Sequence, residues 1–269
     1  MKAPLSCFCV LLFAVAISAC AARQYPEPAD PVADAETLLG HIDERAQRIQ
    51  SARVRAVMEY FGGDGRVRVR QLVVVQEPGD LRLETMSPFD ATLALVVTNE
   101  DDLTYYDLGN DLVYVGAPTA ENLAKLIPLW LEPADIVDVV LGGVPLGSAD
   151  HERSRWKVAW DGRANAWRLF GRAREGGNLE LLVRHGTWSF AGARETNETG
   201  DLKWEIRTAD FTTVEDGETS TEVPMRVRFL MESEGLDVSL AISEYELNPE
   251  LDDLLFEIFT PDHDLIQLD

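Results

Sequence analysis

The sequence predicts a mainly β protein with short helices: a strongly curved antiparallel sheet whose hollow side carries the helices. Apolar and polar residues alternate along most of the chain, in short runs that end at Gly, Pro, Asn or Asp. Two short apolar stretches with helical start and stop signals interrupt this alternation near the middle. Because 46% of the 269 residues are hydrophobic, the chain has enough apolar surface for a large core.

The first 19 residues are typical of a secretory signal, with Lys2 followed by an apolar run too short to span a bilayer. The run ends in "ISAC", residues 17–20, which resembles the lipobox of bacterial lipoproteins. That resemblance implies cleavage before Cys20 and lipidation of its thiol; the alternative is a plain signal with a chance cysteine. Cys7 and Cys9 lie within the signal, so the mature chain would hold no disulfide and no cysteine-based metal site.

The charge balance limits the kinds of partner. The chain carries 47 acidic and 24 basic residues, a net charge of −23. This excess argues against nucleic acid as a partner and against electrostatic adsorption on anionic lipid. A membrane contact would therefore be covalent, through two or three acyl chains, since each buried CH₂ contributes about 0.8 kcal/mol.

Residues 20–34 are acidic and proline-rich without periodicity, which predicts a flexible tether. Asp34 is a plausible helix N-cap, and apolar residues at helical spacing follow to about Gln50. No internal repeat and no second linker follow. Residues 35–269 are therefore expected to form a single domain.

From Ser51 the hydrophobic period changes to two. Arg66, Arg68 and Arg70 alternate with valines and predict a solvated outer face paired with nearby acids. An antiparallel meander of six strands is expected at residues 53–61, 66–75, 81–86, 92–98, 103–107 and 112–116.

Two short helices are expected after the meander. Thr119 can cap the first, which Pro128 should end or kink. Pro133 lies near the start of the second, and Gly142 and Gly143 lie past its end. A second antiparallel series is then expected, with strands at 155–160, 166–170, 179–183, 187–190, 201–211, 224–231 and 236–247.

No catalytic or metal-binding pattern stands out. The chain has no G-x-S-x-G, no H-E-x-x-H, no phosphate-binding loop and no dinucleotide fingerprint. The four histidines are scattered, and neighbouring acids carry no information in so acidic a chain. We therefore expect no enzyme activity, no cofactor and no metal.

The order of the weak motifs resembles the LolA/LolB-like superfamily of bacterial envelope lipoproteins, closest to the outer-membrane lipoprotein receptors of the LolB type. The matching pieces are "PGDLRLETMSPFDATLALVV", "YYDLGNDLVYVG", "LIPL" and "DIVDVVLGGVP", together with the chain end from Pro224. Coverage is about residues 35–145 and 223–269. No single motif is diagnostic; the order and spacing carry the resemblance.

The resemblance implies an incomplete β-barrel of about eleven strands, closed by a helical lid over an apolar cavity. That cavity would accept the acyl chains of lipoprotein cargo or another lipid, received from a soluble LolA-like carrier. The protein would be anchored in the outer membrane, facing the periplasm, by its N-terminal lipid. Ala21, rather than Asp, after Cys20 agrees with that location.

Candidate site residues follow from the resemblance and the alternation. Pro88 and Phe89, in "SPFDA", correspond to a loop that contacts the membrane; the alternative is that Phe89 folds back as a plug. Trp130 is also a candidate for the cavity wall, and with Leu131 it could form a movable lid edge; the alternative is a plain contact between helix and sheet. The candidates for the cavity wall, each of which has ordinary core as its alternative, are Val54, Ala56, Met58, Tyr60, Leu81, Leu83, Leu93, Leu95 and Val97.

The segment from about residue 147 to 222 is longer than the resemblance requires and could alter the cavity mouth or bind another partner. Two classes of function therefore stay open. One is a transport factor that receives acylated cargo in an open cavity. The other is a non-catalytic structural or interaction lipoprotein whose cavity is filled by its own side chains.

Overall fold

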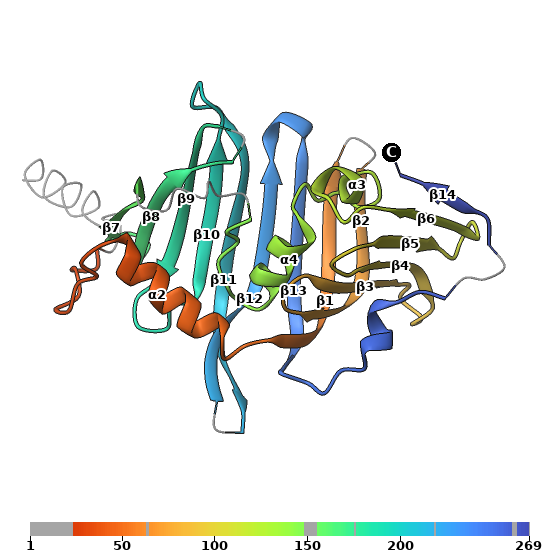
Figure 1. Ribbon diagram of the computed structural model, residues 1–269, viewed down its shortest axis with the longest axis horizontal. Helices are drawn as coiled ribbons and strands as arrows, with labels where there is room; N and C mark the ends of the chain where they lie inside the picture. Colours follow the sequence, from red (N-terminus) through yellow and green to blue (C-terminus); the bar gives the residue numbers. More distant parts are fainter. Residues whose placement is uncertain are drawn as a thin grey trace, which may run out of the picture.

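The computed structural model describes residues 24–62, 65–147, 155–174, 176–217, 219–259 and 263–268, which form one continuous 14-stranded sheet (Figure 1). The strands lie in the order β14-β6-β5-β4-β3-β2-β1-β13-β12-β11-β10-β9-β8-β7. Their bounds are β1 Ser51–Gly62, β2 Gly65–Gln76, β3 Asp80–Met86, β4 Thr92–Thr98, β5 Leu103–Asp107, β6 Leu112–Gly116, β7 Lys157–Asp161, β8 Ala166–Arg172, β9 Asn178–Arg184, β10 Phe190–Thr196, β11 Leu202–Asp216, β12 Thr219–Met231, β13 Leu236–Leu247 and β14 Leu265–Gln267.

The expected mainly β fold with a curved sheet is confirmed, but the sheet is open and has fourteen strands instead of about eleven. β14 and β7 form its two edges. The long segment after residue 147 supplies β7 to β11 and extends one side of the sheet, and β14 adds a strand at the other edge. The pairings are antiparallel except that of β14 with β6.

At the centre of the sheet a strand from early in the chain, β1, pairs with one from late in the chain, β13. β1 pairs with β2 in a hairpin and on its other side with β13, so Met58 lies opposite both Val69 and Leu240. The helices cover one face of the sheet, here called the inner face; the opposite one is the outer face. Figure 1 shows α2 crossing the β7 side and α3 and α4 over the middle.

The helices begin where the capping residues predict. α2 (Ala35–Ala46) has Asp34 as N-cap, whose carboxylate accepts a hydrogen bond from Thr37 N at 2.8 Å. Thr119 caps α3 (Ala120–Ala124) in the same way, and α4 (Pro133–Val140) has proline in its first turn. α2 ends at Ala46 and not near Gln50, because irregular turns replace the helix after it.

Two strands lie outside the expected ranges: β14 at the chain end, where none was expected, and β10. A strand was expected at residues 187–190, yet Trp188 has a positive φ of 54° and belongs to the turn. β10 begins at Phe190 and continues through "AGARE". Small and charged residues with a glycine at a register shift gave this stretch a weak strand pattern.

The outer face carries a small core of its own. Val74, Val97 and Phe256 are buried together there, with Leu95 packed against them. Phe256 belongs to a short 3₁₀ helix (Asp253–Phe256) in the C-terminal segment, where Leu255 O accepts a hydrogen bond from Arg82. The C-terminal segment therefore covers the outer face of β2 to β4.

The described part of the predicted tether, residues 24–34, is held on the fold. Tyr25 N donates to Gly162 O at 2.7 Å, and Trp160 Nε1 donates to Tyr25 O at 3.1 Å. Val32 is buried. This stretch is therefore fixed against β7 and β8 instead of free, because its few apolar and aromatic groups find partners at that edge.

Candidate functional site: two adjoining cavities on the inner face

An apolar cavity of about 270 Å³ lies between the sheet and the segment that contains α3 and α4. Its floor comes from β1 to β5 and from β11 to β13, and its roof from residues 126–131 and α4. The lining is almost entirely aliphatic and aromatic. The floor includes Met58, Val69, Leu83, Val96, Tyr105, Phe229 and Leu240, and the roof Leu126, Ile127, Leu129, Leu131 and Ile136.

The cavity persists because short side chains face it. Val67, Val69, Val73, Ala94 and Val96 form the floor under the roof segment. None of these side chains reaches across the space that a leucine or phenylalanine would fill. Its polar wall is small: Gln71 Nε2 donates to Thr85 Oγ1 at 2.9 Å.

The roof segment links α3 to α4. Ile127 N donates to Leu123 O at 2.9 Å, which continues α3 briefly before Pro128 breaks it. The Glu132 carboxylate accepts a hydrogen bond from Ala120 N at 3.1 Å and ties the two helix starts together. The roof is therefore anchored at both ends and has no regular structure between them.

The C-terminal end of α4 is held by two side chains from other elements. Arg45, buried on α2, donates to Leu141 O at 2.9 Å, and Tyr245, on β13, donates to Val140 O at 3.0 Å. Both groups satisfy carbonyls that a helix leaves unpaired at its end. Burial lowers the pKa of Arg45 to about 10 and raises the pKa of Tyr245, so the Tyr245 hydroxyl stays a donor at neutral pH.

Three acidic residues lie close together at α4: Asp135 and Asp138 on the helix itself, and Glu77 nearby. The Asp135 carboxylate is fully buried and accepts a hydrogen bond from Gly147 N at 2.7 Å. Burial, with Glu77 and Asp135 nearby, raises the pKa of Asp138 well above its ordinary value. Burial likewise raises the pKa of Glu77. Two carboxyl groups beside α4 therefore favour the protonated form more than exposed carboxyl groups do.

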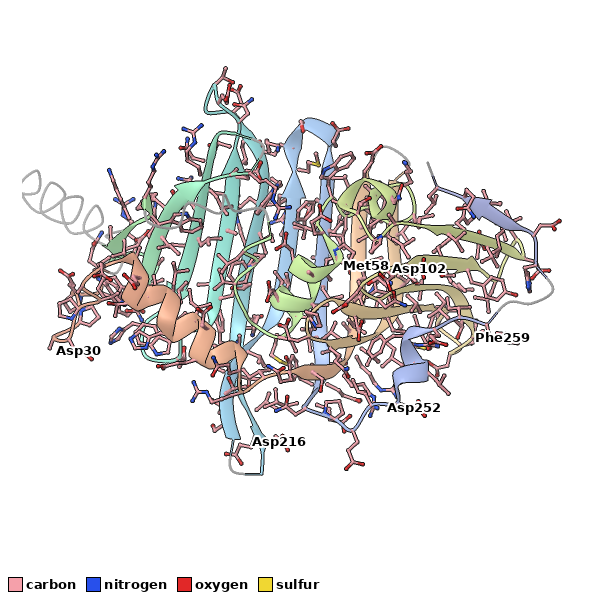
Figure 2. All side chains as sticks on the ribbon, in the orientation of Figure 1. Asp30, Met58, Asp102, Asp216, Asp252 and Phe259 are labelled. Atoms are coloured by element: carbon pink, nitrogen blue, oxygen red, sulfur yellow. The ribbon has the colours of Figure 1, made fainter. Side chains whose placement is uncertain are left out.

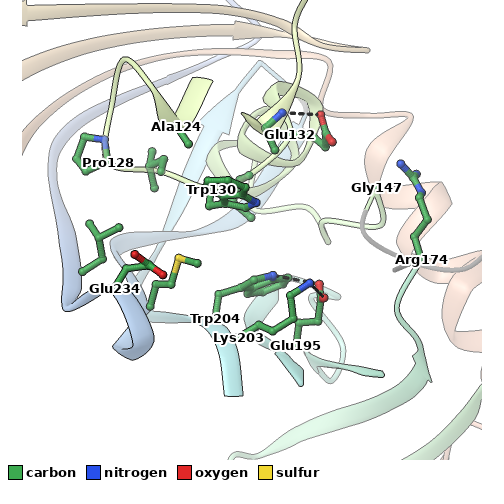
Figure 3. Close-up of a pocket in the computed structure, with 15 residues that line it drawn as sticks. Ala124, Pro128, Trp130, Glu132, Gly147, Arg174, Glu195, Lys203, Trp204 and Glu234 are labelled. Carbon is green, nitrogen blue, oxygen red and sulfur yellow. Dashed lines mark hydrogen bonds and ion pairs between the residues drawn. The ribbon is translucent and has the colours of Figure 1, made fainter. Parts of the chain in front are cut away.

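A second cavity, of about 580 Å³, lies on the other side of the roof segment (Figure 3). It is mixed in character, with Trp130 and Trp204 beside charged side chains. Glu195 is buried; its carboxylate accepts hydrogen bonds from Lys203 Nζ at 2.5 Å and Trp204 Nε1 at 3.1 Å. The remaining charged residues of the lining are Glu132, Arg174 and Glu234.

The structure separates the predicted wall residues into three groups. Met58 and Leu83 line the apolar cavity. Tyr60 is partly buried against the inner core without lining either cavity, and Val54, Ala56 and Leu81 lie in the closed core. Leu93, Leu95 and Val97 were wrongly placed, because they point to the outer face; Leu93 is 43% exposed and the other two pack on the C-terminal segment.

The error on β4 is one of phase. Leu83 pairs with Val96 and Thr85 with Ala94, so the even-numbered residues of β4 face the cavity. A register shift at Thr85/Met86 accompanies the turn. Since residues 93–97 are apolar throughout, the sequence alone could not show which set faces inward.

Trp130 also differs from its predicted place. It is 47% exposed and lines the mixed cavity instead of the apolar one. Leu131, the other residue of the predicted lid edge, lines both cavities, and so does Leu129, which was not singled out from the sequence. The signal that could have found Leu129 is the apolar run on either side of Pro128.

The loop after β3 presents Phe89 to solvent. The ring is 92% exposed, so it does not plug the end of the sheet. Ser87 Oγ accepts hydrogen bonds from Phe89 N at 3.2 Å and Ala91 N at 3.1 Å, and Arg70 pairs with Asp90. A turn held by these hydrogen bonds and this ion pair therefore carries an exposed aromatic ring at its tip.

The three arginines of β2 lie on the outer face as predicted. Arg66 and Arg68 pair with Glu59 at 2.8 and 3.4 Å, and Arg70 pairs with Asp90.

Among the described residues no helix is both long and apolar enough to cross a membrane. No cluster of three or more potential metal ligands occurs in that same part of the chain. Cys20 lies outside the described residues, so its lipidation stays a prediction.

A scan against protein-family models gives no match, and a search of curated protein sequences gives none either. Solved structures do share the fold. A DUF1329 family protein from Desulfovibrio piger has a TM-score of 0.62 and 16% identity, over 83% of this chain and 95% of that one. A LolA superfamily protein from Nitrosomonas europaea has a TM-score of 0.56 and 13% identity, over 84% of this chain and 99% of that one.

A domain from Vibrio parahaemolyticus, classed with outer membrane lipoprotein-sorting proteins, has a TM-score of 0.56 and 14% identity. The match covers 82% of this chain and 97% of that domain. At these identities the likeness establishes a LolA-like fold and nothing finer.

Proposed function

We propose that this protein is a lipid-anchored envelope protein that binds acyl chains of lipoprotein cargo and acts in lipoprotein localisation to the outer membrane. The observation that carries the proposal is the apolar cavity under the roof segment. A filled core would point to a structural role, whereas here a space with an almost wholly apolar lining is left open. The LolA-like fold of lipoprotein-sorting relatives agrees with this use.

The size of the cavity limits its occupant. At about 270 Å³ it lies near the lower end of the usual range of ligand pockets, about 300–1,000 Å³. It therefore has room for part of one acyl chain while the roof stays in place. A longer chain would need the segment at residues 126–131 to shift, and this segment has no regular structure to resist it.

Anchoring and delivery use other parts of the chain in this proposal. Acyl chains on Cys20 hold the protein on the outer membrane, facing the periplasm. Pro88 and Phe89 touch the bilayer while cargo leaves the cavity. Inserting one Phe ring contributes only about 1.5–3 kcal/mol, so the loop assists transfer and does not anchor. Cargo would come from a soluble LolA-like carrier.

Binding of a fluorescent fatty-acyl probe tests the proposal. We expect the wild-type chain to bind it and Ala94→Phe to weaken binding at least tenfold, because the new ring enters the cavity. Leu93→Phe is the matched control, since its neighbouring position faces the outer side. Wild-type chain that fails to bind the probe at micromolar concentration would contradict the proposal.

A second candidate function rests on the other half of the sheet. The inner face of β8 to β10 is filled by its own side chains, including Trp167, Leu181 and Phe190. That half has a closely packed core, which suits an interaction module at the envelope. Retention of a protein partner by Ala94→Phe, with probe binding lost, would favour this function.

A further inference from the structure

The apolar and mixed cavities have a continuous floor. Three strands run beneath both cavities. Each strand contributes one residue to the apolar cavity and one to the mixed cavity, and these two residues are two positions apart on the same face of the strand. These pairs are Ile206 and Trp204 on β11, Phe229 and Met231 on β12, and Val238 and Leu236 on β13. Two residues of a strand span only about 6.6 Å.

The roof between them is a single stretch of chain. Pro128, Leu129 and Leu131 line both cavities, so these residues form the shared wall. The two cavities are therefore the ends of one trough on the inner face, crossed in the middle by the roof segment.

Polarity changes along this trough. The apolar end has Gln71 and Thr85 as its polar lining, and these two are bonded to each other. The mixed end carries charges of both signs. A molecule that matches both ends has a hydrocarbon chain joined to a charged head.

The charges at the mixed end are arranged in two parts. Figure 3 shows Arg174 and Glu234 on opposite sides of the cavity, with Trp130 between them in this view. Lys203 lies beside its partner Glu195. No described residue forms an ion pair with Arg174 or Glu234, so both charges remain available to a ligand.

We propose that the trough binds a single-chain zwitterionic phospholipid, and this inference rests on the proposed acyl-chain binding. The acyl chain occupies the apolar end. The phosphate of the head faces Arg174, and its ammonium group faces Glu234. The exposed indole of Trp130 offers the ammonium a further cation–π contact.

Charge explains the preference for a zwitterion. Two cations and three carboxylates line the mixed end, and the chain as a whole carries a net charge of −23. The excess of negative charge around the cavity would repel a head group with a net negative charge. A head that holds its own ammonium beside the phosphate is not repelled in this way.

Competition among lipids with one common acyl chain tests the head preference. The assay uses the Cys20→Ser variant, so that no acyl group attached to the protein competes for the site. The fluorescent fatty-acyl probe is bound first, and each lipid is then added. We expect lysophosphatidylethanolamine to displace the probe at a concentration at least tenfold lower than uncharged monoacylglycerol does. Lysophosphatidylglycerol, with a net negative head, should need at least threefold more than lysophosphatidylethanolamine.

Two substitutions locate the head. Arg174→Gln and Glu234→Gln should each reduce the advantage of lysophosphatidylethanolamine over monoacylglycerol at least threefold, without altering monoacylglycerol binding. The controls are Arg172→Gln and Glu232→Gln, exposed neighbours that line neither end of the trough. Both controls should keep the wild-type preference.

The outcomes separate the two proposals. Equal displacement by lysophosphatidylethanolamine and monoacylglycerol would overturn the head site while acyl binding stands. A preference that survives both Arg174→Gln and Glu234→Gln would also overturn it. Absence of probe binding altogether would instead overturn the proposed function on which this inference rests.

Discussion

The two halves of the inner face are built on one sheet yet filled differently. On the β7 side, α2 and large side chains leave a closed core in which Trp167, Leu181 and Phe190 are fully buried. On the β1 to β5 side, the roof segment and α4 cover a floor in which valines and Ala94 lie between Met58, Leu83 and Tyr105, and a cavity remains. Figure 2 shows side chains crowding both halves, so ribbon spacing alone does not reveal the difference.

The comparison shows that side-chain volume, more than backbone architecture, distinguishes core from cavity. Strand pairing runs without a break from one half to the other. Leu38 and Ile42 of α2 insert into the filled half as ordinary core residues. The roof segment offers leucines, but Val67, Val69, Val73, Ala94 and Val96 of the floor are too short to fill the space beneath it.

The largest loss of stability is expected when a buried side chain of the filled half is shortened. Leu181→Ala removes a fully buried side chain where neighbours cannot collapse, and we expect a loss of about 2–5 kcal/mol in the free energy of unfolding. Leu83→Ala, beside the existing cavity, should cost less. Urea unfolding of both variants measures the difference, and a greater loss for Leu83→Ala would break the comparison.

A smaller loss is expected from releasing α4. Arg45→Met removes the hydrogen bonds to Leu141 O and Glu222 O while keeping an apolar stem in place, and should cost about 1–3 kcal/mol. Arg48→Met, an exposed neighbour, should stay within about 0.5 kcal/mol of wild type. Equal unfolding midpoints for the two variants would show that Arg45 does not hold the helix.

The pH dependence of the cavity half should reflect Asp138. Its raised pKa means that the folded state keeps a proton that the unfolded chain releases near pH 4, so stability falls as the pH rises through the raised value. Asp138→Asn should remove this fall, by about 1.4 kcal/mol for each unit of pKa difference. Urea unfolding at pH 5, 6.5 and 8 measures it.

The exposed Asp43 on α2 supplies the control for that experiment. Asp43→Asn should follow the wild-type pH dependence. If Asp138→Asn also follows it, the carboxyl of Asp138 is not what limits stability at higher pH.

The smallest effect on stability is expected at the loop tip. Phe89→Glu should leave the free energy of unfolding within about 0.5 kcal/mol, because the ring is 92% exposed. Acyl-probe binding should be unchanged, while transfer of lipidated cargo to liposomes should decrease. Transfer at the wild-type rate would remove the proposed membrane role of this loop.

The sequence by itself determined the local structure. The positions of the first six strands follow from the two-residue alternation and the turns that bound it. The starts of α2 and α3 follow from Asp34 and Thr119, whose side chains bind the first free backbone N–H groups. The solvent-exposed place of Phe89 also agreed with its turn chemistry, since Ser87 and Asp90 are typical turn residues.

Only the tertiary structure decided which residues meet. The pairing of β1 with β13 joins segments nearly two hundred residues apart, and no local pattern encodes it. The inward face of β4 depended on a register shift of one residue, which exchanges Leu95 for Val96. The cavity itself depends on how the volumes of distant side chains add up beneath the roof, a sum that exists only once the sheet has formed.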